Sequence, residues 1–434
     1  MSLPTESRRT ALDLISFIDA SPSPWHAVAS AEQRLQARGF KRLDEAARWS
    51  LAAGGRHYVV RGGASLIAFV AGSGPLAESG FRIVGAHTDS PGLRLKPRPA
   101  LGGDGLARLG VEVYGGPILA SFADRDLSLA GRVMLRTAAG PQARLLRFGQ
   151  PLLRLPNLAI HMNREVNEQG LKFDRQSELP LILGLLGAEE DAEARLRNLL
   201  ADSVQSEAGD LLSWELAAYD VQPGSLWGAN EEFIASRQLD NLASCHAALC
   251  ALTVADAPTA TCVAALFDHE EVGSESAAGA GGSFVGDVLV RIGLSAGLDE
   301  EDRRRAQAQS FFVSADMAHA YNPNFPAAYE PDHKVMVNGG PVIKSNANQR
   351  YATEAATAAR FMDCCRQAGV PFQQYAHRGN LGCGSTIGPI VAARLGIASV
   401  DVGSPMWAMH SARESAGALD PGYMIAALGA AYAS

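Results

Sequence analysis

The sequence lacks the features that mark membrane, disulfide-stabilised or nucleic-acid-binding proteins. No apolar run approaches the roughly 20 residues that cross a bilayer, and the first residues lack the apolar core of a secretory signal. The 6 cysteines form no CxxC pair, which favours reduced thiols in a cytoplasm over a disulfide framework or a cysteine zinc site. The chain has 38 basic and 46 acidic residues and a net charge of −8. Nucleic acid and anionic membranes are therefore poor partners.

Several catalytic motifs are missing as well. His269 is followed by two glutamates, but the second histidine of an HExxH motif is absent. The chain contains no GxSxG nucleophile elbow, no GxGxxG loop and no phosphate-binding loop with its lysine. These absences exclude a helix-borne zincin site, an α/β-hydrolase serine nucleophile and a P-loop nucleotide site.

The composition is that of a globular protein, 47% hydrophobic and 19% charged, and 434 residues suggest about two or three domains. From about residue 95 to 232, short strand-like runs with Gly and Pro between them, PNLAIHM among them, favour a β-rich module. On either side, apolar strands alternate with helical patterns, which predicts an α/β sheet covered on both faces. The strands are expected at 56–60, 64–70, 81–86, 261–267, 310–316 and 397–403, and the helices at 241–252 and 357–369. The pattern therefore predicts one α/β domain, residues 1–94 and 233–434, split by an inserted module, residues 95–232.

Five short clusters of acids and histidines follow or border these apolar segments. Ligands bind at the carboxyl ends of strands in an open α/β sheet, so clusters far apart in the chain can converge there. In the last cluster, Ser411 and Glu414 have the spacing of a capping box, which predicts that a helix begins there. The clusters occupy residues 87–91, 237–241, 268–271, 316–319 and 410–414.

Imidazole and carboxylate groups without thiolates suit Zn²⁺, with Mn²⁺ or Co²⁺ also acceptable. Two histidines and three acids suffice for two ions that share one aspartate and one water. Asp89 can accept the second ring N–H of His87 and fix its tautomer. The adjacent Glu270 and Glu271 diverge, so one can bind a metal while the other acts as general base. Each residue alone also suits an ordinary role, such as a helix cap or a surface histidine, but the five clusters together favour a metal site.

The motifs GAHTDSPG, SRQLDNL, DHEEVGS, SADMAHA, PVIKSNANQRYAT, CGSTIGPI and VGSPMWAMHSARE occur in this order. In this respect the chain resembles the aspartyl aminopeptidases from about Ser23 to its end. The resemblance implies a cytoplasmic zinc exopeptidase with two divalent metal ions and peptide substrates. It further implies a mixed sheet flanked by helices, and an inserted dimerisation module that builds a tetrahedral homo-oligomer, usually a dodecamer.

The resemblance also implies roles for individual residues. It makes Glu270 the general base and Asp89 the carboxylate that steers His87. His161, in the inserted module, is expected to polarise the scissile carbonyl of a neighbouring subunit or of its own, with direct metal ligation as the alternative. The metal ligands would be His87 and Glu271 on one ion, Asp316 and His410 on the other, and Asp240 between them.

The resemblance also implies removal of the N-terminal residue of peptides with a preference for Asp or Glu, which requires a cation in the substrate pocket. Of only five lysines, Lys344 lies in the segment that matches the family's pocket, and we expect it to pair with the substrate carboxylate, although a solvated surface lysine is the ordinary alternative. His319 and Tyr351 are further pocket candidates. Gly384 and Ser385 belong to a glycine-rich turn that opens a helix and can offer backbone N–H groups, although packing alone can equally demand such a tight turn.

Two other functions fit the same residues. A dinuclear metalloaminopeptidase or amidase with broad or neutral preference would use the same ligands. A peptide-binding or assembly protein would keep the scaffold without catalysis, but it would have no need of Glu270 beside a complete ligand set.

Overall fold

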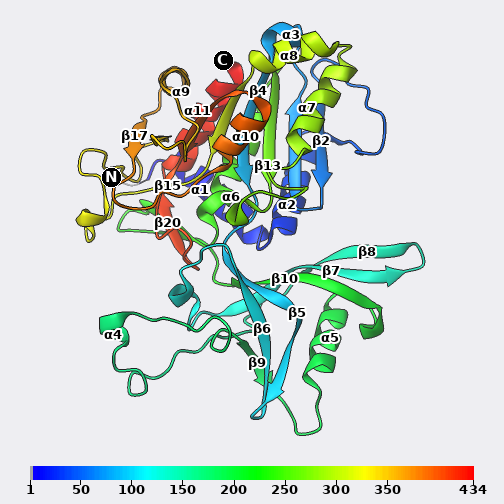
Figure 1. Ribbon diagram of the computed structural model, residues 1–434, viewed down its shortest axis with the longest axis vertical. Helices are drawn as coiled ribbons and strands as arrows, with labels where there is room; N and C mark the ends of the chain where they lie inside the picture. The colour runs from blue at the N-terminus through cyan, green and yellow to red at the C-terminus, as the bar shows by residue number, and fades with distance from the viewer. Residues whose placement is uncertain (1–2) are drawn as a thin grey trace. The chain divides into compact units, whose positions relative to one another are not determined.

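The computed structural model describes residues 3–434, and the chain divides into two compact units (Figure 1). The first unit comprises the residues up to Asp89, Gly224–Met409 and Glu414–Ser434. The second comprises Ser90–Pro223 and, from much later in the chain, His410–Arg413. The boundaries expected from the sequence, 94/95 and 232/233, lie slightly later in the chain, and the return of 410–413 to the second unit was not anticipated.

The first unit is built on a mixed sheet, which confirms the predicted α/β fold. In the described part of the chain this sheet has nine strands in the order β1-β2-β3-β13-β4-β14-β18-β16-β17. Strands β13, β4, β14 and β18 are parallel neighbours, while β3 and β16 pair antiparallel to their neighbours β13 and β18. The strands are β1 Lys41–Arg42, β2 Arg56–Arg61, β3 Ser65–Val70, β4 Phe81–His87, β13 Thr261–Phe267, β14 Phe311–Ala315, β16 Val342–Ser345, β17 Gln373–Ala376 and β18 Ala398–Gly403.

Helices cover both faces of this sheet because its central strands are apolar on both sides. Every residue of β13 is buried, and successive side chains point to opposite faces, so that Leu266 joins one core cluster and Phe267 the other. Helices α1, α2, α6, α9 and α11 contribute to the first cluster, and α7, α8 and α10 to the second. The helices are α1 Thr5–Ala20, α2 Pro24–Gln36, α3 Leu76–Ser79, α6 Leu239–Thr253, α7 Phe284–Ser295, α8 Glu300–Ala308, α9 Ala355–Gln367, α10 Ile387–Leu395 and α11 Asp420–Ala433.

The first unit also contains a small sheet that corrects one expectation. Ser411–Glu414 does not begin a helix: Glu414 opens strand β20, and the next helix, α11, begins at Asp420. The reason is that β20 pairs with β12, with Glu414 opposite Ser236, and the buried Glu414 carboxylate accepts the backbone N–H of Asp240 instead of capping a helix. The strands of this sheet are β11 Ser225–Trp227, β12 Phe233–Ser236, β15 Ala318–His319, β19 Pro405–Trp407 and β20.

The second unit is β-rich, as expected. Its sheet has the order β8-β7-β10-β5-β6-β9, all neighbours antiparallel, and helix α5 (Ala192–Ser203) packs Leu196 and Leu200 into its core. The strands are β5 Gly92–Gly103, β6 Leu106–Tyr114, β7 Leu127–Thr137, β8 Gly140–Arg147, β9 Leu181–Leu185 and β10 Leu211–Asp220, and a short helix α4 spans Val166–Gln169.

Residues 156–162 of this unit were expected to form a strand, and this expectation was wrong. The segment is an exposed loop, in which the N–H of Met162 bonds back to the carbonyl of Ala159 in a local turn instead of joining a ladder. Between residues 3 and 434, no helix is both long enough and apolar enough to cross a bilayer.

Candidate metal centre

Three of the predicted clusters follow adjacent parallel strands. His87 is the last residue of β4 and lies opposite Phe267, the last residue of β13. On its other side β4 pairs with β14, which ends one residue before Asp316. The carboxyl ends of the three strands therefore bring His87, Asp316 and the segment after Phe267 to one edge of the sheet, as expected for an α/β site.

The His87 imidazole lies among several acids. Its Nε2 atom is 3.4 Å from Oδ1 of Asp240, 3.7 Å from Oδ1 of Asp316 and 3.9 Å from Oε2 of Glu270. Ligand atoms of His87, Asp240 and Asp316 all lie within 4.8 Å of one another, as do those of His87, Glu270 and Glu271. Atoms at such separations can share one or two cations.

Asp89 holds His87 and the two glutamates in position. His87 Nδ1 lies 3.0 Å from the backbone oxygen of Asp89 and 3.4 Å from its Oδ1 atom. The two carboxylate oxygens of Asp89 accept the backbone N–H groups of Glu270 and Glu271, each at 3.1 Å. Fully buried, Asp89 thus fixes the imidazole and the glutamate pair together.

Asp240 is held just ahead of the regular part of α6. Asp240 and Asn241 have non-helical backbone angles, so the regular helix begins at Leu242, one residue after the start expected from the sequence. The N–H of Asp240 bonds to Glu414, and the side-chain amide of Asn241 donates to the Ala315 carbonyl at 2.9 Å. These bonds tie the start of α6 to the end of β14, where Asp316 follows.

The electrostatics of the cluster favour cation binding. Burial, together with the charges of Asp316, Asp89 and Asp240, raises the pKa of Glu270 to about 8 against the opposing effect of His87. Burial lowers the pKa of His87, but hydrogen bonds to Asp240, Asp316 and Asp89 raise it well above its ordinary value. Several acids buried around one imidazole are costly unless cations neutralise them. The donor set of imidazole nitrogen and carboxylate oxygen is one that Zn²⁺ accepts, so the residues fit divalent metal ions.

Two predicted residues belong to the second unit. His410 lies in the 410–413 segment, and its Nδ1 atom is 3.0 Å from the carbonyl of Gly116. His161 is exposed in the loop that follows residue 155.

Lys344 is buried, so the structure contradicts the alternative of a solvated surface lysine. Its Nζ atom donates to the backbone oxygens of Asp316 (3.1 Å) and Met317 (3.2 Å) and lies 5.0 Å from the centre of the Tyr351 ring. His319 lies in the same region of the fold, with its ring 6.2 Å from that of Tyr375. Lys344 therefore lies between the backbone that carries Asp316 and the ring of Tyr351.

Sequence reasoning missed one acid near these residues. Asp401, buried in β18, accepts the N–H of Ala352 and the hydroxyl of Thr386. Thr386 caps α10, and the turn with the exposed Gly384 and Ser385 leads into it. An acid in the middle of the apolar strand 397–403 was the available signal.

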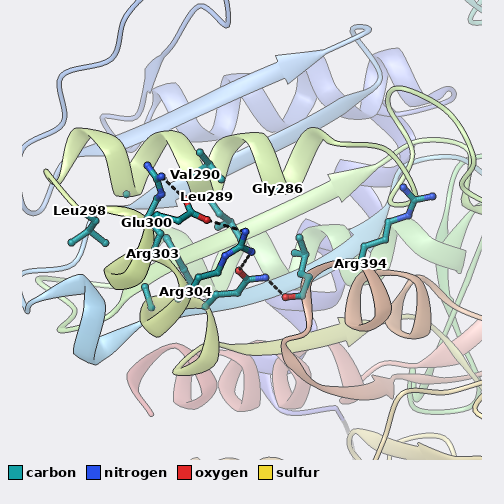
Figure 2. Close-up of a pocket in the computed structure, with 13 residues that line it drawn as sticks. Gly286, Leu289, Val290, Leu298, Glu300, Arg303, Arg304 and Arg394 are labelled. Atoms are coloured by element: carbon teal, nitrogen blue, oxygen red, sulfur yellow. Dashed lines mark hydrogen bonds and ion pairs between the residues drawn. The ribbon is translucent and has the colours of Figure 1, made fainter.

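A separate cavity of about 180 Å³ is lined by residues of α7, α8 and α10 (Figure 2). Its charged groups are largely paired with one another: Glu300 bonds to Arg303 and Arg304 on the same helix, and Arg394 bonds to Glu275. None of the metal-centre residues lines this cavity.

Acids and an imidazole gathered at the strand ends of a mixed α/β sheet define a metalloenzyme. The family model of the aminopeptidase I zinc metalloproteases (M18) matches residues 17–432. A probable M18 family aminopeptidase 2 from Stutzerimonas stutzeri is 49% identical over 425 residues, 97% of each chain, and one from Azotobacter vinelandii is 48% identical over 433 residues, 98% of this chain and 99% of the relative.

Solved structures of related proteins also match this chain. The chain resembles Ape4 in its complex with Nbr1, with a TM-score of 0.95, 36% identity and coverage of 100% of this chain and 88% of the other. It also resembles prApe1, with a TM-score of 0.91, 27% identity and coverage of 98% and 94%. The chain belongs to the M18 family and is a zinc aminopeptidase.

Proposed function

We propose that this aminopeptidase removes N-terminal Asp or Glu from peptides with the help of two divalent ions, zinc in the first place, with Mn²⁺ or Co²⁺ as alternatives. The observation that carries the preference is the buried ammonium group of Lys344 beside the backbone of Asp316. An ammonium group has three N–H donors, and two of them are used by backbone oxygens. We infer that the third donates to a substrate carboxylate, in a charge-assisted bond.

For the ligands we propose a pairing different from the one expected. The separations around His87 Nε2 support His87, Asp240 and Asp316 as one set. Asp240 would also belong to a second set, together with Glu271 and His410, which would hold the second ion. When bound, the ions activate a water molecule and polarise the substrate carbonyl as Lewis acids.

The chain's own residues would supply the proton transfers. Glu270 takes a proton from the attacking water and delivers it to the leaving amine. Cations beside it favour its ionised form, which a base requires. Asp89, through the backbone of Glu270, holds this carboxylate in place. His161, from a neighbouring copy, would stabilise the developing oxyanion; direct ligation of a metal is the alternative role.

Around the substrate, we assign the side-chain carboxylate to Lys344, with His319 and Tyr351 as walls of the pocket. The turn that contains Gly384 and Ser385 would present backbone N–H groups to the peptide. Capture of the free α-amino group by a metal or an acid would limit cleavage to the first residue.

We further propose self-association through the inserted module. A solved structure of mApe1 from S. cerevisiae, 26% identical with a TM-score of 0.85, is described as a dodecamer, and a tetrahedral dodecamer is the assembly we assign to this chain. Exposed apolar side chains of the second unit support an interface role, among them Leu158 (66% exposed), Met162 (75%) and Leu185 (78%). The cytoplasmic location stays a prediction.

The test compares hydrolysis of Asp-, Glu-, Leu- and Lys-anilides by the metal-loaded enzyme. The acidic substrates should react fastest, and a chelator should abolish hydrolysis until metal is restored. Lys344→Met should lower kcat/KM for the Asp-anilide roughly 10- to 100-fold, the value of a hydrogen bond between charged groups, and should change the Leu-anilide far less. Lys41→Met, at an exposed lysine of the short strand β1, is the matched control.

The two alternative functions predict different results in the same assays. If the Leu-anilide reacts faster than the Asp-anilide and Lys344→Met leaves their ratio unchanged, the enzyme is a broad metalloaminopeptidase or amidase. Two tightly held metal ions without turnover of any substrate would instead favour a peptide-binding protein.

A further inference from the structure

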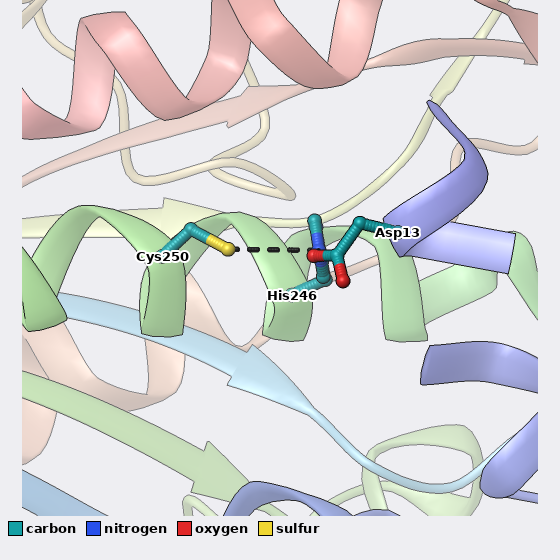
Figure 3. A group of neighbouring side chains, drawn as sticks. All are labelled: Asp13, His246 and Cys250. Carbon is teal, nitrogen blue, oxygen red and sulfur yellow. Dashed lines mark hydrogen bonds and ion pairs between the residues drawn. The ribbon is translucent and has the colours of Figure 1, made fainter. Parts of the chain in front are cut away.

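A second group of ligand-type side chains, Asp13, His246 and Cys250, lies outside the metal centre; we refer to it as the thiol cluster. His246 and Cys250 are four residues apart on α6 and therefore face the same side of the helix. Asp13 reaches the same imidazole from α1 (Figure 3). Ligand atoms of the three residues lie within 4.8 Å of one another.

Asp13 and Cys250 both lie beside the same ring nitrogen of His246. Nε2 of His246 is 2.6 Å from Oδ2 of Asp13 and 3.5 Å from Sγ of Cys250. This nitrogen carries either a proton to donate to Asp13 or a lone pair to accept the thiol proton, so it cannot satisfy both neighbours at once. A cation between the three atoms would satisfy all of them.

We propose that Asp13, His246 and Cys250 form a further metal site, for a divalent ion of the zinc class that accepts a thiolate. Thiolate sulfur, imidazole nitrogen and carboxylate oxygen are the three ligand types of protein zinc sites. On binding, Cys250 releases its thiol proton to solvent and becomes the thiolate ligand. The site stands apart from the proposed catalysis, because none of its residues is assigned to the metal centre.

The distances require only a small adjustment. Zinc-ligand bond lengths in a tetrahedral site place neighbouring ligand atoms about 3.3 to 3.6 Å apart, and the separation of 3.5 Å between His246 and Cys250 already matches. The Asp13–His246 contact must open by roughly 0.7 Å to reach that range. Asp13 can make this movement because its side chain is 47% exposed, whereas His246 is held in the interior beside Phe17. A cavity of about 550 Å³, lined by all three residues, leaves room for a water molecule as fourth ligand.

The surroundings predict weaker binding than in the metal centre. Arg34 donates to both carboxylate oxygens of Asp13, at 2.8 and 3.0 Å, and Arg9 and Arg38 line the same cavity. Arg34 can orient the carboxylate as an outer partner of the metal, but its charge opposes a dication. We therefore expect the site to fill only after the metal centre is occupied.

Cobalt provides a test that does not depend on activity. The zinc-loaded enzyme is titrated with Co²⁺ while the thiolate-to-cobalt charge-transfer absorption in the near ultraviolet is followed. Cobalt that exchanges into the metal centre gives no such band, because the ligands proposed there are nitrogen and oxygen atoms. The band should appear and saturate near one cobalt per chain, should persist in Cys383→Ser, and should be absent in Cys250→Ser. Cys383 is the matched control because, like Cys250, it is a free cysteine that is not fully buried.

A weaker variant extends the test to the oxygen ligand. Asp13→Asn should keep the band but require at least about 10-fold more cobalt, because a neutral amide is a poorer ligand than a carboxylate. The proposal is overturned if the wild-type enzyme develops no thiolate band, or if the band survives unchanged in Cys250→Ser.

Discussion

Helix α6 carries residues of two very different ligand clusters, and their contrast shows what makes a strong metal site. At its start, Asp240 joins a buried group in which acids outnumber the imidazole and no thiol takes part. Three residues before its last residue, Cys250 joins a group whose single acid, the half-exposed Asp13, already pairs with Arg34. The residue types overlap, but only the first group accumulates uncompensated negative charge. The balance of charge, more than the presence of ligands, separates the two.

The largest effect that separates the clusters should come from Glu270→Gln. It removes the base but keeps the shape of the side chain, so kcat should fall about 10²- to 10⁴-fold while metal content stays the same. Cys250→Ser, on the same helix as Asp240, should leave kcat within about twofold of the wild-type value, because the thiol cluster has no part in the proposed reaction. Steady-state kinetics with metal analysis measures both. Loss of metal in Glu270→Gln would show that Glu270 is a ligand and that Glu271 is the base.

A smaller effect is expected from Asp89→Asn, which tests whether the metal centre depends on its supporting acid. The amide cannot accept both backbone N–H groups and still hold His87 as a carboxylate does, so metal affinity should fall about 10- to 100-fold. Competition with a chelator of known affinity gives the value. Asp256→Asn, at an exposed loop position, controls for the loss of one negative charge. Equal affinities in the two variants would remove Asp89 from the organisation of the site.

The smallest effect concerns the Asp13–His246 pair. The hydrogen bond from His246 lowers the pKa of Asp13 against the effect of burial. Burial lowers the pKa of His246, but the bond to Asp13 raises it above its ordinary value. Stability from the lowered aspartate pKa is present above about pH 4, and stability from the raised histidine pKa is present below about pH 6.5 and lost as pH rises through the folded-state value.

Asp13→Asn should therefore destabilise the protein most between about pH 4 and 6.5 and least near pH 9. Because the aspartate is half exposed and also faces Arg34, the loss should stay below about 1 kcal/mol. Urea unfolding of both proteins at pH 5.5 and 9 gives the comparison. An equal loss at the two pH values would mean that the pair is not ionised in the folded protein.

The sequence predicted those parts of the molecule whose patterns are local. Fully apolar strands such as 261–267 and helices such as 241–252 were assigned correctly because period and length identify them. The meeting of His87, Asp240 and Asp316 followed from their place at the ends of strands and helices. Errors arose where partners far along the chain decide the outcome: Glu414 pairs with β12 instead of capping a helix, and residues 156–162 find no strand partner.

Burial of polar side chains was also hard to foresee. Lys344 resembles a surface lysine in sequence, and only the fold shows that the carbonyls of residues 316 and 317 receive it. Asp401 illustrates the reverse case, since an acid inside an apolar strand is visible in the sequence, but its partners Ala352 and Thr386 are not.

The grouping of residues 410–413 with the second unit limits how the inserted module could be removed or transferred. His410 rests on the carbonyl of Gly116, and Ala412 donates to the hydroxyl of Ser121, so this four-residue stretch depends on a segment encoded almost three hundred codons upstream. The inserted module therefore cannot be removed or transferred as one continuous segment. Excising residues 90–223 and rejoining the ends would strip one histidine of its scaffold, and a graft of the insertion into another protein would have to carry the distant stretch with it.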